Sequence, residues 1–184
     1  MSDPHTGADL DAWHDLGAWA KADPGNWAVW PLLYHLAKLM RARTTVEVGI
    51  GRGHGTYVLG LHAKEVGGKH YAIDVASGMI NRATLVVRQF DLPVTVLHGD
   101  SKAIVWRQGI DLLYVDGGHS SEQVYGDLEN YAPWVRRGGL MILDDYGKRH
   151  LGVTEAADTW MTVHFADWST MGWPWCWWLL CRRL

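Results

Sequence analysis

Residues 44–53, with the sequence TTVEVGIGRG, decide the fold. The first half of this stretch is rich in threonine and valine, which favour strands, and the second half holds closely spaced glycines. Glycine lets a chain turn sharply and lets a ligand approach the backbone. Apolar periodicity predicts a helix over 54–65, whose unpaired N–H groups at its start can face the same ligand. We therefore expect a strand, a glycine loop and a helix that together form a ligand-binding unit.

The rest of the chain repeats this alternation of strand and helix. Further strands are predicted over 69–75, 94–98, 110–115 and 139–143, and further helices over 77–90, 120–132 and 153–165. Such alternation predicts a parallel sheet with helices on both faces. Two last strands, 166–171 and 175–181, are separated by the turn signal Gly172-Trp173-Pro174 and predict a hairpin. The expected fold class is α/β, with a doubly wound, seven-stranded, mostly parallel sheet and a C-terminal antiparallel hairpin.

A single domain suits a chain of 184 residues, because one hydrophobic core can be built at this length. We expect residues 44–184 to form the core of this domain. Residues 1–43, with helices predicted over 9–22 and 27–41, are expected to form a helical cap. The chain has 12 tryptophans, most of them near its two ends. Packing is the simpler interpretation of these side chains, and an aromatic substrate pocket or an oligomer interface is the alternative.

Composition and charge exclude several classes of partner. The formal net charge of -3 argues against nucleic acid, because phosphate binding usually requires an excess of basic residues. No apolar run reaches the roughly 18 residues of a membrane span, and the polar, acidic residues 1–11 are unlike a secretory signal. Cys176 and Cys181 are an odd number of residues apart in a predicted strand, so they point to opposite faces and no disulfide is expected between them. The expected location is therefore the reducing cytoplasm.

Glycine or carboxylate residues follow each of the predicted parallel strands. These strand ends are the glycine loop, Asp74, Asp100 with Ser101, Asp116 to His119, and Asp144 with Asp145. Ligands of doubly wound sheets bind outside the carboxyl ends of the strands. Asp74 can accept hydrogen bonds from both hydroxyls of a ribose, which supports a nucleoside ligand. A NAD-binding loop would need glycine at the position of His54, which disfavours a NAD-dependent oxidoreductase.

The pattern E-x-G-x-G-x-G that begins at Glu47 resembles class I S-adenosylmethionine-dependent methyltransferases, over about residues 44–181. The resemblance implies a Rossmann-like fold and S-adenosylmethionine as the cofactor. It places the glycine loop around the methionine part, Glu47 near the ammonium group and Asp100 at the adenine. The alternative for Asp100 is a cap for a helix over 101–106. The residues assigned to the cofactor site are Glu47, Gly49, Gly51, Gly53, Asp74, Asp100, Ser101 and Asp116.

Three carboxylates, Asp116, Asp144 and Asp145, follow the fourth and fifth strands. Like charges this close repel each other unless protons or a cation lie between them, and carboxylate oxygens suit Mg²⁺. The pattern resembles the metal-dependent O-methyltransferases, in particular the group of macrocin O-methyltransferase and cephalosporin hydroxylase-like proteins, which implies that these three residues bind the metal. The alternative for Asp144 and Asp145 is that they only form the polar end of the fifth strand. Because successive side chains diverge on an extended segment, only one of that pair need point at the ion.

The resemblance leaves the general base open, because Gly118 stands where several members of the group have a second acid. His119 is a candidate, since imidazole titrates close to neutral pH, and Asp116 is also assigned to catalysis. The alternative for His119 is a structural role at the start of the helix over 120–132. His54 is interpreted as a helix-start residue.

The expected function is transfer of a methyl group from S-adenosylmethionine to a hydroxyl of a small molecule, assisted by a metal. The alternative is a cofactor-binding module without catalysis that acts as a partner or regulator. Residues 1–43 and 146–174 are expected to form the acceptor pocket. That pocket is either shallow or completed by a second subunit of a homo-oligomer.

Overall fold

The computed structural model describes residues 29–147, 150–173 and 178–184. The predicted helix over 9–22, the start of the helix over 27–41, and Cys176 lie outside these residues. The described helices are α2 (Val29–Leu39), α3 (His54–Val66), α4 (Ser77–Phe90), α5 (Ser121–Tyr131) and α6 (Leu151–His164), with short 3₁₀ turns η2 (Ser101–Ala103), η3 (Ala132–Trp134) and η4 (Phe165–Asp167). The strands are β1 (Thr44–Val48), β2 (Lys69–Asp74), β3 (Val94–His98), β4 (Ile110–Val115), β5 (Val135–Leu143), β6 (Trp168–Trp173) and β7 (Trp178–Arg183).

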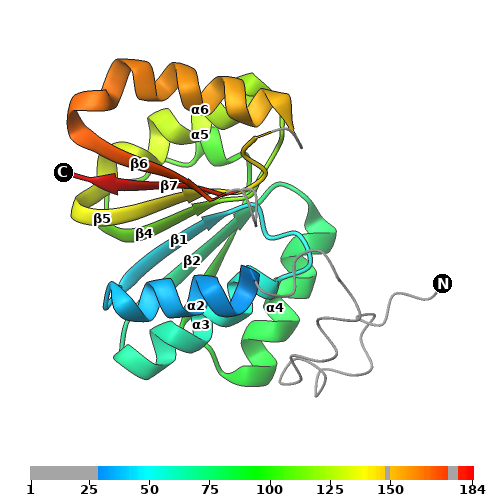
Figure 1. Ribbon diagram of the computed structural model, residues 1–184. Helices are drawn as coiled ribbons and strands as arrows, with labels where there is room; N and C mark the ends of the chain where they lie inside the picture. The colour runs from blue at the N-terminus through cyan, green and yellow to red at the C-terminus, as the bar shows by residue number, and fades with distance from the viewer. Residues whose placement is uncertain (1–28, 148–149, 174–177) are drawn as a thin grey trace.

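The described strands form one seven-stranded sheet in the order β3-β2-β1-β4-β5-β7-β6. Strands β1 to β5 run parallel, whereas β7 pairs antiparallel with both β5 and β6 (Figure 1). From β1 the chain moves outward to β2 and β3, and it then returns to β4 on the other side of β1. The predicted doubly wound sheet with its C-terminal hairpin is therefore confirmed. Its topological switch point, where such sheets bind ligands, lies at the carboxyl ends of β1 and β4.

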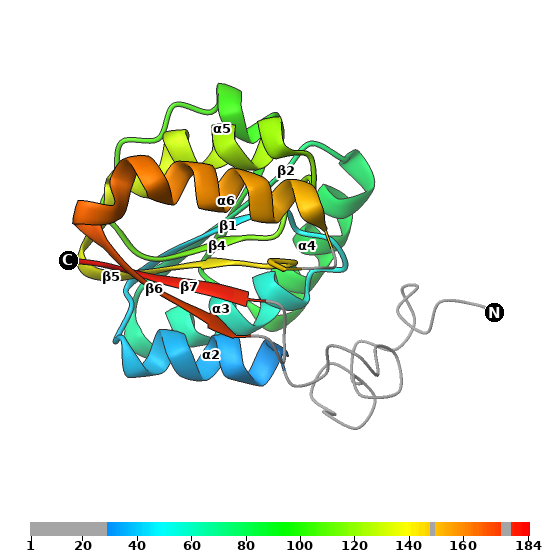
Figure 2. The same cartoon turned by 45° about the horizontal axis from the view of Figure 1, so that its top comes forward.

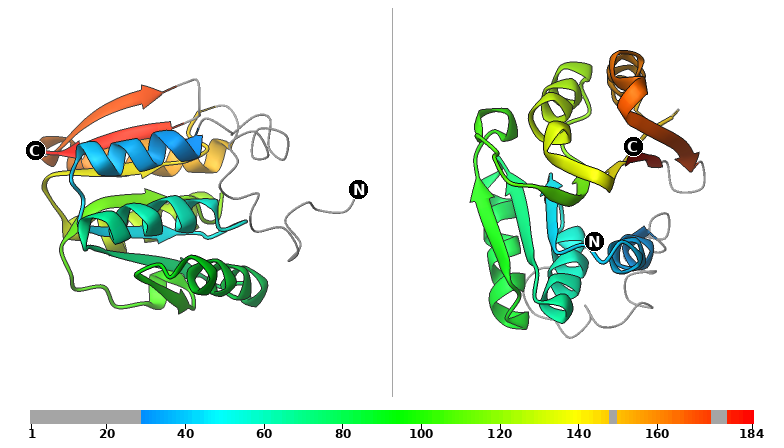
Figure 3. Two further views of the ribbon diagram at one scale, coloured as in Figure 1. Left: turned by 90° about the horizontal axis from the view of Figure 1, so that it is seen from below. Right: turned by 90° about the vertical axis from the view of Figure 1, so that its left-hand side faces the viewer.

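Helices cover both faces of the sheet. Helices α5 and α6 lie on one face, and α2, α3 and α4 lie on the other, as seen in Figure 1 and Figure 2. Figure 3 shows α2, α3 and α4 in front of the sheet when the molecule is seen from below, and it shows the molecule from one end in its second view. Alternate residues of β4 pack into the two cores, since Leu112 and Tyr114 join α2 and α3 while Leu113 and Val115 join α5 and α6. All four side chains are buried, which explains why this strand is almost wholly apolar.

The start of β5 differs from the prediction. The strand begins at Val135 rather than at residue 139, and its pairing with β4 shifts register between Ile110 opposite Val135 and Leu112 opposite Leu140. Extra residues on the β5 side bulge out of the ladder at this point. The prediction missed them because Arg136 and its neighbour are exposed and interrupt the apolar pattern. A second difference is the short turn η2, which replaces a helix over 101–106.

The C-terminal hairpin belongs to the sheet, because β7 lies between β5 and β6. The side chains of Trp178 and Cys181 are fully buried, and burial raises the pKa of the Cys181 thiol. The turn predicted at 172–174 is wrong in part, since Gly172 and Trp173 belong to β6.

Among the described residues, no helix combines the length and the apolarity that a membrane crossing requires.

Candidate active site

The glycine loop after β1 touches the loop after β4 at the switch point. Gly49 has a φ of 93°, and a Cβ at this position would lie 2.1 Å from the carbonyl oxygen of Asp116. Glycine is therefore required for the two loops to approach this closely. Backbone hydrogen bonds fix the junction, because the N–H of Gly49 donates to Ile73 over 2.9 Å and the N–H of Asp116 donates to Val48 over 2.8 Å. The predicted loop thus packs against the acidic end of β4.

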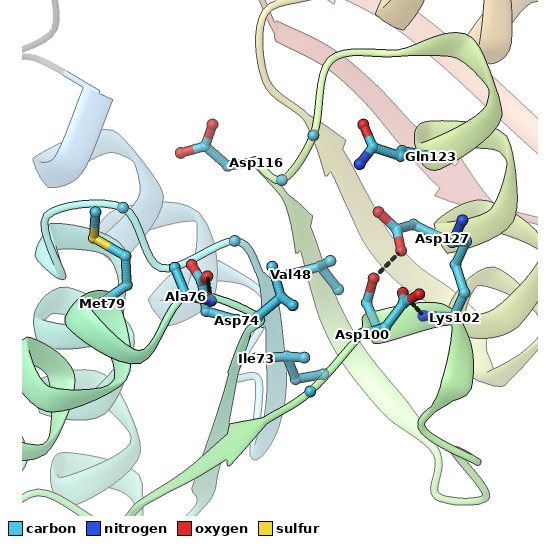
Figure 4. Close-up of a pocket in the computed structure, with 17 residues that line it drawn as sticks. Val48, Ile73, Asp74, Ala76, Met79, Asp100, Lys102, Asp116, Gln123 and Asp127 are labelled. Atoms are coloured by element: carbon cyan, nitrogen blue, oxygen red, sulfur yellow. Dashed lines mark hydrogen bonds between the residues drawn. The ribbon is translucent and has the colours of Figure 1, made fainter.

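A cavity of about 450 Å³ opens beside this junction, a volume within the usual range of small-molecule sites. In Figure 4, Asp74 stands on one side of the cavity, Asp100 and Asp127 stand on the other, and Asp116 stands at the rim. Most residues that the sequence assigned to the cofactor do line it, namely Gly49, Gly51, Asp74, Asp100, Ser101 and Asp116.

Asp74 forms part of the cavity wall that lies nearest to the glycine loop. Its Oδ2 accepts a hydrogen bond from the N–H of Ile50 over 2.9 Å, and its Oδ1 accepts one from the N–H of Ala76 over 2.8 Å. Each carboxylate oxygen can accept a second hydrogen bond. The Asp74 carboxylate can therefore hold the loop and still accept hydrogen bonds from hydroxyl groups of a ligand.

Glu47 and Gly53 do not line the cavity. The buried carboxylate of Glu47 lies beneath the loop, where it accepts a hydrogen bond from the Thr56 hydroxyl over 2.6 Å and lies 3.4 Å from Nε2 of His70. Gly53 immediately precedes α3 as its N-cap. Both residues fix the connection between β1 and α3.

The far wall of the cavity contains a buried acid that sequence reasoning missed. Asp100 caps η2, as its alternative interpretation expected, by accepting a hydrogen bond from the N–H of Lys102 over 3.0 Å. The Ser101 hydroxyl donates to Oδ1 of Asp127 over 2.5 Å. Burial raises the pKa of Asp127 to about 6, and the charge of Asp100 adds to the rise. The sequence signal for Asp127 was its spacing on α5, because it follows the apolar Val124 by three residues and therefore lies on the same face of the helix.

Asp116 and Asp144 meet at the hydroxyl of Tyr114. This hydroxyl donates to Oδ2 of Asp144 over 2.7 Å and lies 3.3 Å from Oδ2 of Asp116. Burial raises the pKa of Asp116 well above its ordinary value, and the charges of Asp144, Asp145 and Glu47 raise it further. Sequence reasoning did not assign Tyr114 to the site, although a phenol in a mostly aliphatic strand was a usable signal.

Asp145 points to a different set of partners. Its Oδ2 lies 3.0 Å from Nε2 of His119 and 3.6 Å from Nε2 of His150. Of the three carboxylates expected to bind a metal, the structure brings Asp116 and Asp144 together and places Asp145 between two histidines. The sequence had no spacing signal for His150.

Residues 46–146, more than half of the chain, match the family described as "Methyltransferase domain". The chain belongs to this methyltransferase family. The matched residues run from β1 to the turn after β5 and include the glycine loop, Asp116 and Asp144. The resemblance to class I S-adenosylmethionine-dependent methyltransferases is thereby confirmed.

Several solved structures share the fold of this methyltransferase over nearly its whole length. A methyltransferase of Podospora anserina bound to S-adenosylhomocysteine has a TM-score of 0.72 and 10% identity, with 95% of this chain and 88% of that chain covered. An O-methyltransferase of Bacillus cereus in complex with S-adenosylhomocysteine has a TM-score of 0.72 and 13% identity, with 97% and 93% covered. The O-methyltransferase TomG of Streptomyces achromogenes, in complex with S-adenosylmethionine, has a TM-score of 0.67 and 16% identity, with 96% and 91% covered. At these identities the similarity shows the fold alone.

A short stretch is similar to a curated relative, an uncharacterised protein of Acanthamoeba polyphaga mimivirus. The two are 42% identical over 38 residues, which is 21% of this chain and 17% of that protein. The match therefore spans only a small part of the relative's length.

Gly118 stands where several metal-dependent O-methyltransferases have an acid, and in this methyltransferase a larger side chain at this position would meet Gln123. A Cβ at residue 118 would lie 2.3 Å from Oε1 of Gln123, an oxygen that accepts a hydrogen bond from the Ser120 hydroxyl over 2.9 Å. Ser120 also caps α5, because its side-chain oxygen accepts a hydrogen bond from the N–H of Gln123. The Gln123 amide, which lines the cavity, thus fills the space that a side chain at residue 118 would need.

Proposed function

We propose that this chain transfers a methyl group from S-adenosylmethionine to a hydroxyl oxygen of a small molecule. The observation that carries the proposal is the cavity at the switch point, with Asp74 and Asp100 on opposite walls and Asp116, next to Asp144, at the rim. Family membership supports methyl transfer. Oxygen as the acceptor is supported by the similar structures of Bacillus cereus and Streptomyces achromogenes, which are O-methyltransferases.

In this proposal the cofactor lies across the carboxyl ends of β1, β2 and β3. Asp74 accepts hydrogen bonds from the ribose hydroxyls, Asp100 and Ser101 lie at the adenine, and the glycine loop lies at the methionine part. The methyl group would then face the rim that Asp116 occupies. Methyl transfer is an in-line displacement, so holding the sulfonium and the acceptor oxygen in line is the main contribution expected of the site.

A divalent cation suits the carboxylates at the rim. Burial raises the pKa of Asp116, and the negative charges of Asp144 and Asp145 raise it further. A bound cation would offset this repulsion. We propose Asp116 and Asp144 as its ligands, with Mg²⁺ as an ion that carboxylate oxygens suit. Asp145, which the sequence assigned to the same ion, would have to turn away from the histidines to join them. Such an ion, when bound, lowers the pKa of an acceptor hydroxyl and fixes its direction.

Two residues are candidates for accepting the proton of the acceptor hydroxyl. Asp116 lies at the rim, where the carboxylate oxygen that does not bind the ion would accept the proton. His119 follows in the same loop, and its Nε2 lies 3.0 Å from Oδ2 of Asp145. That contact orients the imidazole and leaves Nδ1 as the atom that would accept the proton.

We further propose one domain, with residues 44–184 as the cofactor-binding core and residues 1–43 as a cap. The described part of this cap is α2, which packs on the sheet face covered by α3 through the buried Leu33 and Ala37. The acceptor would bind between the cap and the rim, because the cofactor fills the cavity.

Methyl transfer from labelled S-adenosylmethionine to a panel of small phenols, sugars and alcohols tests this function. We expect the wild-type chain to label at least one acceptor and Asp74→Ala to reduce the rate. The matched control is Glu155→Ala, which removes an exposed acid of α6 and should leave the rate unchanged. Binding of S-adenosylhomocysteine without transfer to any acceptor would favour the alternative, a cofactor-binding module without catalysis.

A further inference from the structure

Two imidazoles and one carboxylate converge beside the proposed site. Nε2 of His119 and Nε2 of His150 lie 3.0 Å and 3.6 Å from the same oxygen, Oδ2 of Asp145. One donor atom from each residue lies within 4.8 Å of the other two. The two imidazole rings are stacked, with centroids 3.9 Å apart and an interplanar angle of 22°. Both rings therefore present the same edge to one carboxylate oxygen.

The backbone brings these three residues together. Asp145 has a φ of 58°, a left-handed conformation that is uncommon for residues other than glycine, and its carboxylate faces the histidines. Near the start of α6, Gly152 lies so close to His119 that a Cβ would be 2.4 Å from the His119 carbonyl oxygen. This close approach carries His150, two residues earlier, to the ring of His119.

We propose that His119, Asp145 and His150 bind a divalent transition-metal ion. Two imidazoles and one carboxylate are a known donor set for such ions and leave coordination positions open for other ligands. Imidazole nitrogen suits zinc, iron, nickel and copper, whereas Mg²⁺ prefers oxygen. The side chains of His119 and His150 are 46% and 34% exposed, while that of Asp145 is 10% exposed. An ion can therefore enter from solvent and meet a carboxylate that is already largely desolvated.

The proposed ion would lie close to the rim of the cofactor cavity. His119, Asp144 and Asp116 all border a second, small cavity of about 10 Å³. A role of this ion in methyl transfer rests on the proposed function. An imidazole that binds a cation is a poor proton acceptor, so the inference then assigns the role of general base to Asp116 rather than to His119.

Titration of the chelator-treated, tag-free chain with Co²⁺ tests the site, because Co²⁺ bound by nitrogen and oxygen ligands absorbs visible light. We expect a saturable Co²⁺ site with an absorption band that is lost in His119→Ala and in His150→Ala. The matched control is His35→Ala, which removes an exposed histidine of α2 and should leave the band unchanged. Excess Mg²⁺ should not displace the Co²⁺.

Each variant is also measured for thermal unfolding and for affinity toward S-adenosylhomocysteine. If His150→Ala does not fold, His150→Gln, which keeps more of the side-chain volume, takes its place, and it too should lose the band. A band that survives both histidine substitutions would overturn the proposal. So would a band that is lost in Asp116→Ala but retained in His150→Ala, since the ion would then lie among the carboxylates. Asp74→Ala should retain the Co²⁺ band while weakening cofactor binding, so failure of the metal site and failure of the proposed function are distinguishable.

Discussion

Asp144 and Asp145 are adjacent in the chain, yet their carboxylates contact different partners. Oδ2 of Asp144 lies 2.7 Å from the Tyr114 hydroxyl, and Oδ2 of Asp145 lies 3.0 Å from Nε2 of His119. The two side chains diverge because β5 ends at Leu143 and Asp145 takes up a left-handed conformation with a φ of 58°. Substitutions can therefore test the two acids separately.

Asp144→Ala is expected to abolish turnover while leaving the affinity for S-adenosylhomocysteine nearly unchanged. The carboxylate is absent from the residues that line the large cavity but contacts the Tyr114 hydroxyl beside Asp116. Asp144→Asn is the companion variant, because it keeps an acceptor for Tyr114 and removes the charge, and it should also be inactive. Steady-state kinetics and calorimetry measure the two effects. A parallel loss of turnover and affinity would instead indicate a folding defect.

Methyl transfer is expected to stop in excess chelator and to recover when Mg²⁺ or Mn²⁺ is added back. The reason is the repulsion among Asp116, Asp144 and Asp145, which adds to the effect of burial in raising the pKa of Asp116. A divalent cation would offset this repulsion. The rate of transfer from labelled S-adenosylmethionine is the readout. Undiminished transfer in chelator would remove the metal from the mechanism and make His119 the leading candidate for the base.

The stability of the chain is expected to depend on pH through Asp127. Its pKa is raised to about 6 in the folded chain, above the value of about 3.9 for an exposed aspartate. The folded state therefore holds this proton more tightly than the unfolded state. This contribution favours folding below about pH 4 and is lost as pH rises through about 6, with a size on the order of 3 kcal/mol.

Denaturant unfolding of the wild type and of Asp127→Asn between these pH values checks the prediction. Asparagine keeps an acceptor for the Ser101 hydroxyl and carries no charge. The variant should therefore gain stability relative to the wild type as pH rises, while the contributions of other groups cancel in the comparison. Stability curves that stay parallel across this range would show that Asp127 does not titrate as described.

Deletion of the residues after Gly172 is expected to abolish soluble expression. The deletion removes β7, which pairs with both β5 and β6 and places Trp178 and Cys181 in the core. Its loss would expose the edge of β5 and leave β6 without its partner. Solubility and circular dichroism of the truncated chain are the readouts, and a truncated chain that folds normally would refute the structural role of the hairpin.

Much of the fold followed from local pattern. The apolar residues of β4 are buried on both faces, so composition alone indicated a central strand. The loop after β1 was predictable because its closely spaced glycines are typical of a sharp turn. The bulge at the start of β5 did not follow, because its register depends on pairing with β4 rather than on local preference. The cavity at the ends of these strands was predictable because parallel topology brings their carboxyl ends to one edge.

The parts of the site that the sequence did not reveal depend on tertiary contacts. Asp127 lies on α5 and reaches the cavity only because that helix packs beside η2. His150 reaches His119 because Gly152 allows a close contact between the start of α6 and the loop after β4, which are distant in the chain. The conformation of Asp145 decides which partners its carboxylate contacts, and an adjacent pair of acids in a sequence carries no information about a left-handed turn between them.

Calorimetric titration with S-adenosylhomocysteine tests the central claim most directly. The account predicts binding of one molecule per chain, weakened by about 1–3 kcal/mol in Asp74→Ala, because a charged acceptor of ligand hydrogen bonds is lost. Glu155→Ala, on the exposed side of α6, should bind as the wild type does. If neither S-adenosylhomocysteine nor S-adenosylmethionine binds to the folded wild-type chain, the assignment of the cavity to this cofactor is contradicted.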